Sequence, residues 1–330
     1  MPMTTPTSID RRRVLGALAA TALAGTTGAR AQSFPSKPVK VIVGFAPGGA
    51  VDIIARAVGT HLSASLGQPV VIDNRPGAGT NIAMRALIES PPDGYTLMLA
   101  ANSLAANPSL YEPPPFDPAR DVTPISVVGR VPVVLAVGAG SSIDSLPALI
   151  AAAKAKPRSI TYGSPGNGST PHLAVALFER RAGIQLSHVP YKGGAPAITD
   201  VLGGHIVGVA DNALEVQPHV KSGKLRVLAV MTPQRSGIFP DVPTVAESGF
   251  PGFEAAVWYV FIGPAGLPAP VVTRLHADIQ RALATEDVKN RLVSAGGEVL
   301  PGPIEQATKL VADERARYEK LIREERIKPD

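Results

Sequence analysis

The chain has 330 residues, of which 45% are hydrophobic, with no cysteine and a formal net charge of +5. The lack of cysteine excludes disulfides, thiol catalysis and cysteine-ligated metals. After the first 31 residues no cluster of lysine and arginine occurs that would indicate binding to nucleic acid or to an acidic membrane surface.

Residues 1–31 have the pattern of an export signal. Arg11–Arg13 precede the uncharged apolar segment Val14–Gly25, and Ala29-Arg30-Ala31 matches an Ala-x-Ala cleavage site. The apolar segment is shorter than the roughly 20 residues that a membrane-spanning helix needs. We therefore expect a signal peptide that is cleaved after Ala31, by either the general or the twin-arginine route. The exported chain of 299 residues would be periplasmic, with a charge of +2.

Short β-branched runs alternate with helical periodicity along the rest of the chain, which predicts an α/β fold with mostly parallel sheets. The expected strands are 39–43, 70–72, 95–100, 131–137, 159–161, 206–210 and 225–231. The expected helices are 54–66, 82–88, 146–155, 197–202, 216–222, 271–283 and 304–325, with a further helix beginning near His172. The strands 131–137 and 225–231 are expected to form a two-strand hinge between two domains. Domain 1 would then comprise 32–131 and 232–330, and domain 2 would comprise 132–231.

Two glycine-rich loops each join an expected strand to an expected helix. The first is Gly44–Asp52, and the second is Tyr162–Thr170. The first N–H groups of a helix have no intrahelical partner and lie at the positive end of the helix dipole, so such loops can bind carboxylates. Because the loops fall in different domains, we expect them to face each other across a ligand cleft. A third glycine loop, 74–80, precedes the helix at 82–88.

Five motifs follow one another in a specific order along the chain. They are Phe45-Ala46-Pro47-Gly48-Gly49, Pro92-Asp93-Gly94-Tyr95-Thr96-Leu97, His188-Val189-Pro190-Tyr191-Lys192-Gly193-Gly194, Ser222-Gly223-Lys224-Leu225-Arg226 and Asp241-Val242-Pro243-Thr244. In this order they resemble the periplasmic solute receptors of tripartite tricarboxylate transporters, the Bug-type binding proteins. The resemblance extends from Phe34 to Pro329. It implies a type II clamshell of two domains that closes on a small carboxylate and delivers it to the membrane permease subunits of a tripartite carrier. We expect a monomer without cofactor or metal.

The resemblance also implies which residues hold the ligand. One carboxylate would be bound by backbone amides of both glycine loops, and the distal part would be selected by polar side chains at strand ends. The residues expected to contact the ligand are Ala46, Pro47, Gly48, Gly49, Ala50, Asp52, Ser103, Ser164, Gly166, Asn167, Gly168, Ser169, Thr170, Tyr191, Asp211 and Asn212. The chain departs from the family pattern at Ala176, Ala210 and Val260, which leaves the size and shape of the ligand open.

Structural roles compete with ligand contact at several of these positions. Asp52 lies in the first helical turn and can bond the amides of its own loop, and Ser169 and Thr170 can cap a helix. His172 is interpreted as a packing or hydrogen-bonding residue rather than a general base. Trp258-Tyr259 is expected to pack in the core or at the hinge.

Two other functions remain open from the sequence. The same clamshell could present its ligand to a membrane sensor kinase. An α/β enzyme acting on a small carboxylate is disfavoured, because the chain lacks a Gly-x-Ser-x-Gly elbow, a Walker motif and a His-Glu-x-x-His motif. Its six histidines are also scattered, without the spacing of metal ligands.

Overall fold

The computed structural model describes residues 1–2 and 34–328. The predicted export signal therefore lies outside the described residues, except for Met1 and Pro2. The chain divides into two compact units, Met1–Ser36 and Lys37–Asp330. The first unit contributes only five described residues, and all the helices and strands belong to the second.

The first sheet brings together strands from both ends of this unit. Its strands are β1 (Val39–Val43), β2 (Val70–Asn74), β3 (Thr96–Ala100), β4 (Val122–Gly138), β9 (Ala256–Pro264) and β10 (Glu298–Val299). The strand order is β2-β1-β3-β9-β4, and β10 also pairs with β4. β1 is parallel to both β2 and β3, whereas β9 is antiparallel to β3 and β4. The C-terminal part of the chain thus supplies a central strand of the N-terminal sheet.

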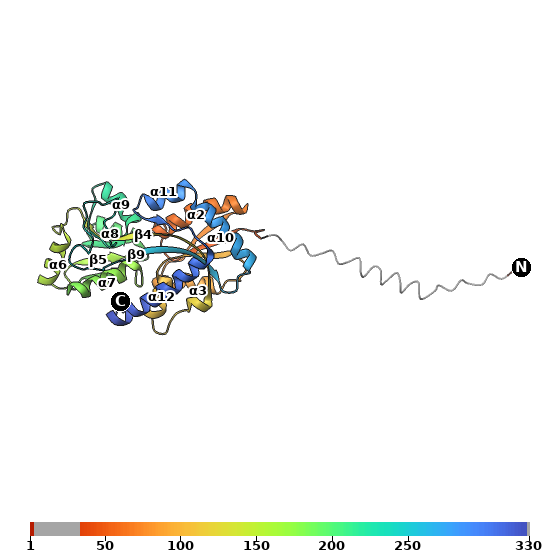
Figure 1. The fold of residues 1–330 in the computed structure, drawn as a ribbon, viewed down its shortest axis with the longest axis horizontal. Helices are drawn as coiled ribbons and strands as arrows, with labels where there is room; N and C mark the ends of the chain where they lie inside the picture. Colours follow the sequence, from red (N-terminus) through yellow and green to blue (C-terminus); the bar gives the residue numbers. More distant parts are fainter. Residues whose placement is uncertain (3–33, 329–330) are drawn as a thin grey trace. The chain divides into compact units, whose positions relative to one another are not determined.

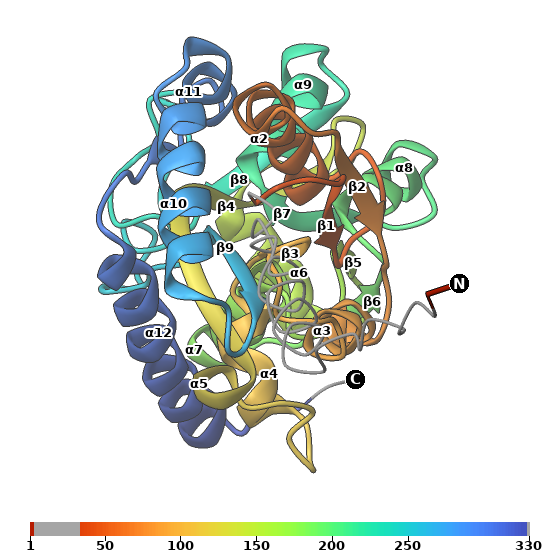
Figure 2. The ribbon, with the colours of Figure 1, turned by 90° about the vertical axis from the view of Figure 1, so that its right-hand side faces the viewer.

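Helices cover both faces of the first sheet. They are α2 (Ala50–Leu66), α3 (Asn81–Ile88), α4 (Ser103–Leu110), α5 (Pro118–Asp121), α10 (Ala269–Leu283), α11 (Glu286–Val293) and α12 (Ile304–Glu325), with a short 3₁₀ helix η1 (Ala78–Thr80). In Figure 2, α2, α10 and α11 lie on one side of the strands, and α3, α4 and α12 lie on the other. One face of α12 is apolar and buried in the core, through Ala307, Val311, Tyr318 and Ile322.

The second sheet continues from β4. Its other strands are β5 (Thr161–Ser164), β6 (Ser187–Pro190), β7 (Gly208–Asn212) and β8 (Leu225–Val230), and its helices are α6 (Leu146–Ala155), α7 (Thr170–Ala182), α8 (Gly194–Leu202) and α9 (Ala213–Lys221). β4 pairs with β9 as far as Pro132 and with β7 and β8 from Val133 onward, so one continuous strand belongs to both sheets. Figure 1 shows α6, α7, α8 and α9 on one side of this crossing and α2, α3 and α10 on the other.

The sheets are mixed. Parallel pairing is found among β1, β2 and β3 and among β5, β6 and β7, whereas all described pairings of β4 and β9 are antiparallel. The alternation of strands and helices in the sequence predicts only the parallel part. The antiparallel centre arises because the chain returns to each sheet from a distant segment.

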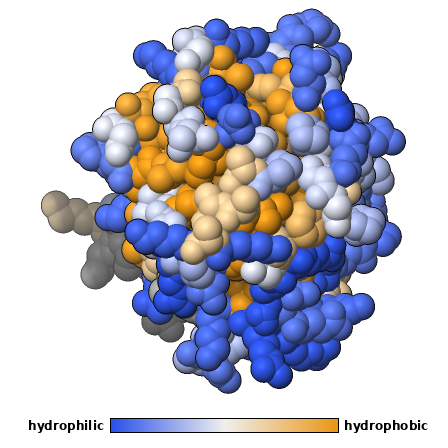
Figure 3. All heavy atoms as spheres, turned by 90° about the vertical axis from the view of Figure 1, so that its left-hand side faces the viewer, coloured by the Kyte–Doolittle hydropathy of each residue, from blue (hydrophilic) through white to orange (hydrophobic). Residues whose placement is uncertain are grey.

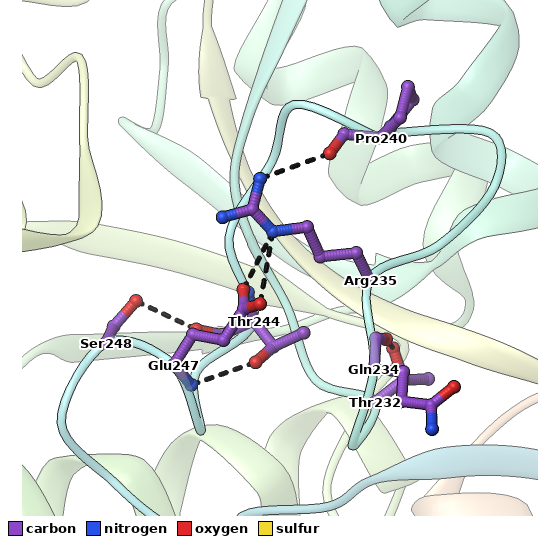
Figure 4. A network of polar contacts seen from close by, with 7 residues as sticks. All are labelled: Thr232, Gln234, Arg235, Pro240, Thr244, Glu247 and Ser248. Atoms are coloured by element: carbon purple, nitrogen blue, oxygen red, sulfur yellow. Dashed lines mark hydrogen bonds and ion pairs between the residues drawn. The ribbon is translucent and has the colours of Figure 1, made fainter.

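The chain returns from β8 to β9 through the loop 231–255, which a polar network holds in shape (Figure 4). Nε of Arg235 donates to Oε2 of Glu247 at 2.9 Å, and the guanidinium also donates to the carbonyl oxygen of Pro240. Glu247 in turn accepts the N–H of Thr244 at 2.9 Å, and its own N–H donates to Oγ1 of Thr244. The loop is therefore ordered by its own side chains.

Helix α4 is the clearest element that the sequence analysis missed. Seven of its eight residues are buried, and it contains Pro108. A helix that is buried all round has no polar face, so it lacks the periodicity from which helices are recognised.

A buried hydrogen bond fastens α12 to the end of β3. Nδ2 of Asn102 donates to Oη of Tyr318 at 3.0 Å and to the carbonyl oxygen of Ala256 at 3.2 Å. Tyr318→Phe is expected to lower the free energy of unfolding by about 1 kcal/mol, because Asn102 keeps its second acceptor. Urea denaturation of the two proteins measures the difference. A loss above about 3 kcal/mol would contradict this local account.

Candidate functional site

Two adjoining cavities lie beyond the carboxyl ends of strands from both sheets, where ligands bind in open α/β folds. The smaller has a volume of about 30 Å³ and the larger about 220 Å³, and Phe45, Ser103, Pro165 and Ser169 line both. The segments that follow β1, β3 and β5, and the last residues of β7, contribute to their walls. The structure thus brings the two predicted glycine loops together at one site.

Ten of the predicted ligand residues line these cavities. They are Gly49, Ala50, Ser103, Gly166, Asn167, Ser169, Thr170, Tyr191, Asp211 and Asn212. The other six line neither cavity, and they are Ala46, Pro47, Gly48, Asp52, Ser164 and Gly168. Gly48, Asp52, Ser164 and Gly168 take part in hydrogen bonds within the two loops and so support the walls from behind.

The first glycine loop is organised by Asp52, which is 3% exposed. The N–H of Gly48 donates to Oδ2 of Asp52 at 3.0 Å, and Nδ2 of Asn74 donates to Oδ1 at 3.0 Å. Arg56, one helical turn further on, donates to the same carboxylate. These contacts therefore support the structural role of Asp52, which holds the amides of its own loop, over contact with the ligand.

The second glycine loop is supported by stacked rings. His188 stacks on Tyr162 and on His172, with ring centroids 4.9 and 4.4 Å apart. Nε2 of His188 lies 2.7 Å from Oγ of Ser164, which also accepts the N–H of Gly166 at 3.1 Å. Nδ1 of His172 accepts the N–H of Gly168 at 3.2 Å, so His172 has the hydrogen-bonding role expected of it.

A glutamate that the sequence analysis did not select lies at the N-terminus of α2. Glu215, in the first turn of α9, is 8% exposed, and its Oε1 accepts the N–H of Ala50 at 2.7 Å. An anion does lie at this helix start, as the dipole argument predicts, but it is a side chain of the protein. The expectation that loop amides are free for a ligand is therefore wrong for Ala46, Gly48, Ala50, Gly166 and Gly168, whose N–H groups all donate within the protein. An acid in a first helical turn is common, so the sequence carried no specific signal for Glu215.

Asp211 and Glu215 form a buried acidic pair beside the smaller cavity. Asp211 is fully buried, and its Oδ1 accepts both the N–H and Nδ2 of Asn212, at 2.8 and 2.9 Å. Nδ2 of Asn212 also donates to Oε1 of Glu215 at 2.9 Å, so one amide joins both carboxylates. Burial and the nearby charge of Glu215 raise the pKa of Asp211 well above its usual value, and burial likewise raises the pKa of Glu215.

Tyr191 lines the larger cavity, but its hydroxyl is used elsewhere. Oη donates to Oδ2 of Asp200 at 2.5 Å, and burial together with this hydrogen bond raises the pKa of Tyr191 to about 12. Lys192, which is exposed, and Gly79 and Thr80 of the third glycine loop line the same cavity, although the sequence analysis did not select them. Among the described residues, no helix is long and apolar enough to cross a membrane, and no cluster of histidine and acidic side chains is suited to a metal ion.

Comparison with known proteins gives consistent matches along the chain. Residues 54–327 match the sequence profile of TctC, described as the tripartite tricarboxylate transporter family receptor. Protein BugT of Bordetella pertussis is 39% identical over 296 residues, which cover 89% of this chain and 91% of BugT.

Solved structures are similar over almost their whole length. A protein of R. palustris with adipate is 36% identical with a TM-score of 0.85, covering 90% of this chain and 100% of that one. MatC of Rhodopseudomonas palustris with bound malate is 30% identical with a TM-score of 0.83, covering 88% and 100%. A TctC solute-binding protein of Polaromonas without ligand is also 30% identical and covers 88% of this chain and 100% of that one, but its TM-score is only 0.62.

Proposed function

Because the chain belongs to the tripartite tricarboxylate transporter receptor family, we propose that it captures a small carboxylate between its glycine loops and delivers it to a membrane permease. The resemblance indicated by the sequence motifs is confirmed by the family match. The α/β clamshell fold of periplasmic binding proteins agrees with the solved neighbours, and these are solute-binding proteins rather than enzymes. The carboxylate, the permease and the periplasmic location after cleavage at Ala31 are the proposed part.

The observation that carries the proposal is the larger cavity between the loops. Its volume of about 220 Å³ corresponds to about seven water molecules at roughly 30 Å³ each, which suits a small organic acid. Its wall includes hydroxyl groups of Ser103 and Ser169 together with Lys192. Hydroxyl donors and a lysine favour a carboxylate over a neutral or cationic group.

The similarity to neighbours supports a closed arrangement of the two domains. At comparable sequence identity, the TM-scores are 0.85 and 0.83 for structures that contain adipate and malate, but 0.62 for one without ligand. Two hydrogen bonds would hold this arrangement, from Ala46 N–H to the carbonyl oxygen of Lys192 at 2.7 Å and from Ala50 N–H to Glu215. Of the two predicted hinge strands, only β4 passes from one sheet to the other, and the chain returns through the loop 231–255. Opening at these two connections would then admit and release the ligand.

Delivery requires a surface that a membrane partner can recognise. The face seen in Figure 3, on the side of α6 and α8, has an apolar area surrounded by hydrophilic residues. Apolar areas with a polar rim are typical of protein-interaction sites. This face supports the proposed docking to permease subunits.

A thermal-unfolding screen of the purified protein tests the proposed carboxylate. The protein is first stripped of bound ligand by unfolding and refolding, and then mixed with small carboxylates and with their amides. A carboxylate at 100 times its Kd should add about 2.7 kcal/mol to the free energy of unfolding, while its amide adds none. If no carboxylate raises the unfolding temperature, the proposed ligand class is wrong.

A further inference from the structure

We propose that Thr80 is a positioning residue of the ligand site, which holds the hydroxyl of Ser103 in place as a hydrogen-bond donor to a carboxylate of the ligand. The inference rests on the proposed function, because that function supplies the carboxylate as acceptor. Three features of Thr80 carry it: a left-handed backbone conformation, a buried side chain and a hydrogen bond to Ser103.

Thr80 has a backbone conformation that its residue type rarely adopts. It ends the third glycine loop with φ +77°, and the three residues before it, Gly77, Ala78 and Gly79, also have positive φ. Glycine adopts a positive φ readily, whereas a β-branched residue there is an outlier. Strain of this kind persists where the surrounding structure imposes it, and it is concentrated at ligand sites. The position therefore points to a role of the threonine side chain that a glycine could not fill.

The side chain of Thr80 contacts two segments that line the larger cavity. Thr80 is 3% exposed, and a Cβ atom on Gly44 would lie 2.8 Å from its Cβ and 3.0 Å from its Cγ2, so its methyl group packs against the first glycine loop. Its Oγ1 donates to Oγ of Ser103 at 2.9 Å. The two contacts together define the rotamer, with the methyl group on the loop and the hydroxyl on Ser103.

Helix α4 holds the third glycine loop next to Ser103. Ser103 begins α4, and Asn107 follows one turn later. Nδ2 of Asn107 donates to the carbonyl oxygen of Gly79 at 2.7 Å and to Oδ1 of Asn81 at 2.8 Å. Residues four apart lie on the same face of a helix, so this face of α4 packs against the loop. The residues on either side of Thr80 are therefore anchored to the helix that carries Ser103.

The hydrogen bond from Thr80 determines how Ser103 can interact with a ligand. A hydroxyl has one donor proton and two acceptor sites. Because Oγ of Ser103 accepts from Thr80 and has no other hydrogen bond among the described residues, its own proton is left to donate. Ser103 lines both cavities, and Thr80 lines the larger one. A carboxylate in the larger cavity would accept this proton, and the bond from Thr80 would strengthen Ser103 as a donor.

Calorimetric titration of Thr80 variants tests the inference. The probes are acetate, benzoate, succinate, malate, adipate and citrate, and the acid that binds the unmodified protein most tightly is used for the variants. Thr80→Val keeps the shape of the side chain and should weaken binding about 10-fold, because Ser103 loses its donor. Thr80→Ser keeps the hydroxyl and should bind within about 2-fold of the unmodified protein.

A double-mutant cycle shows whether Thr80 acts through Ser103. Ser103→Ala alone should weaken binding at least 10-fold, and adding Thr80→Val to it should cause no further loss. A general structural role of Thr80 would instead lower affinity in both backgrounds. Thr123→Val is the matched control, because Oγ1 of Thr123 donates to the carbonyl oxygen of Pro264 at 3.1 Å and Thr123 lines neither cavity. Its affinity should be unchanged.

The outcomes separate this inference from the proposed function. If Thr80→Val binds the acid as the unmodified protein does, or if its effect adds to that of Ser103→Ala, the positioning role is overturned while a carboxylate receptor remains. Binding of none of the acids by the unmodified protein would overturn the proposed function, and the inference with it. Thr80→Gly removes the hydroxyl and the strain together, so it replaces the valine variant if that variant fails to fold, with the same expected loss.

Discussion

Gly79→Ala is expected to weaken ligand binding by about 100-fold, because it obstructs closure of the cleft. Gly79 has φ +58°, and a Cβ there would lie 2.6 Å from the carbonyl oxygen of Asn167 in the second glycine loop and 2.6 Å from Oη of Tyr111. The tyrosine can rotate away, but the backbone carbonyl cannot. The collision therefore destabilises the closed arrangement by about 3 kcal/mol and leaves the open arrangement unaffected. Calorimetry with the ligand found by screening measures the loss, and solution scattering should show a larger radius of gyration.

Gly67→Ala is the matched control for this prediction. Gly67 ends α2 with φ +65°, and a Cβ there would have no neighbour within 4 Å. Both substitutions place alanine in a left-handed conformation, at a cost of about 1 kcal/mol in stability, but only one adds a collision across the cleft. Unchanged affinity is expected for Gly67→Ala. If Gly79→Ala also binds as the unmodified protein does, contact between these loops is not part of the bound state.

Asp52→Ala is expected to lower the free energy of unfolding by about 2 kcal/mol at neutral pH, because it leaves the N–H of Gly48 and the amide of Asn74 without their acceptor. Burial alone would raise the pKa of Asp52, but the hydrogen bonds from Arg56, Gly48 and Asn74 outweigh it and leave the pKa below its usual value. The unfolded chain therefore takes up the proton more readily. The stabilisation is complete above about pH 4 and is lost as the pH falls through the folded-state pKa.

Denaturation of both proteins at several pH values checks this prediction. The difference between them should shrink as the pH is lowered below about 4. Asp313→Ala is a matched control, because Asp313 also pairs with a basic residue one helical turn away but is 62% exposed. Asp313→Ala should lower the free energy of unfolding by less than about 0.5 kcal/mol. An equal loss in the two variants would mean that Asp52 contributes no more than a surface ion pair.

Local patterns in the sequence were sufficient for many of the elements and for the family, but not for α4 or β9. The helices 146–155 and 304–325 and the strand 39–43 have the predicted bounds, because their capping residues, periodicity and β-branched runs are properties of consecutive residues. The two glycine loops were identified for the same reason. They follow strands and precede helices, and the structure places both at one pair of cavities.

The tertiary structure alone decided which groups meet inside those cavities. The acidic pair depends on α9 packing across the cleft from α2, where Glu215 reaches an amide 165 positions earlier in the chain. The antiparallel β9 at the centre of the first sheet likewise depends on a return from the far end of the sequence. Periodicity reports on neighbours within a few residues, whereas buried charge and the occupancy of loop amides are set by contacts between distant segments. The sequence therefore determined a receptor with two glycine loops, and the fold decided that a carboxylate of its own occupies one of them.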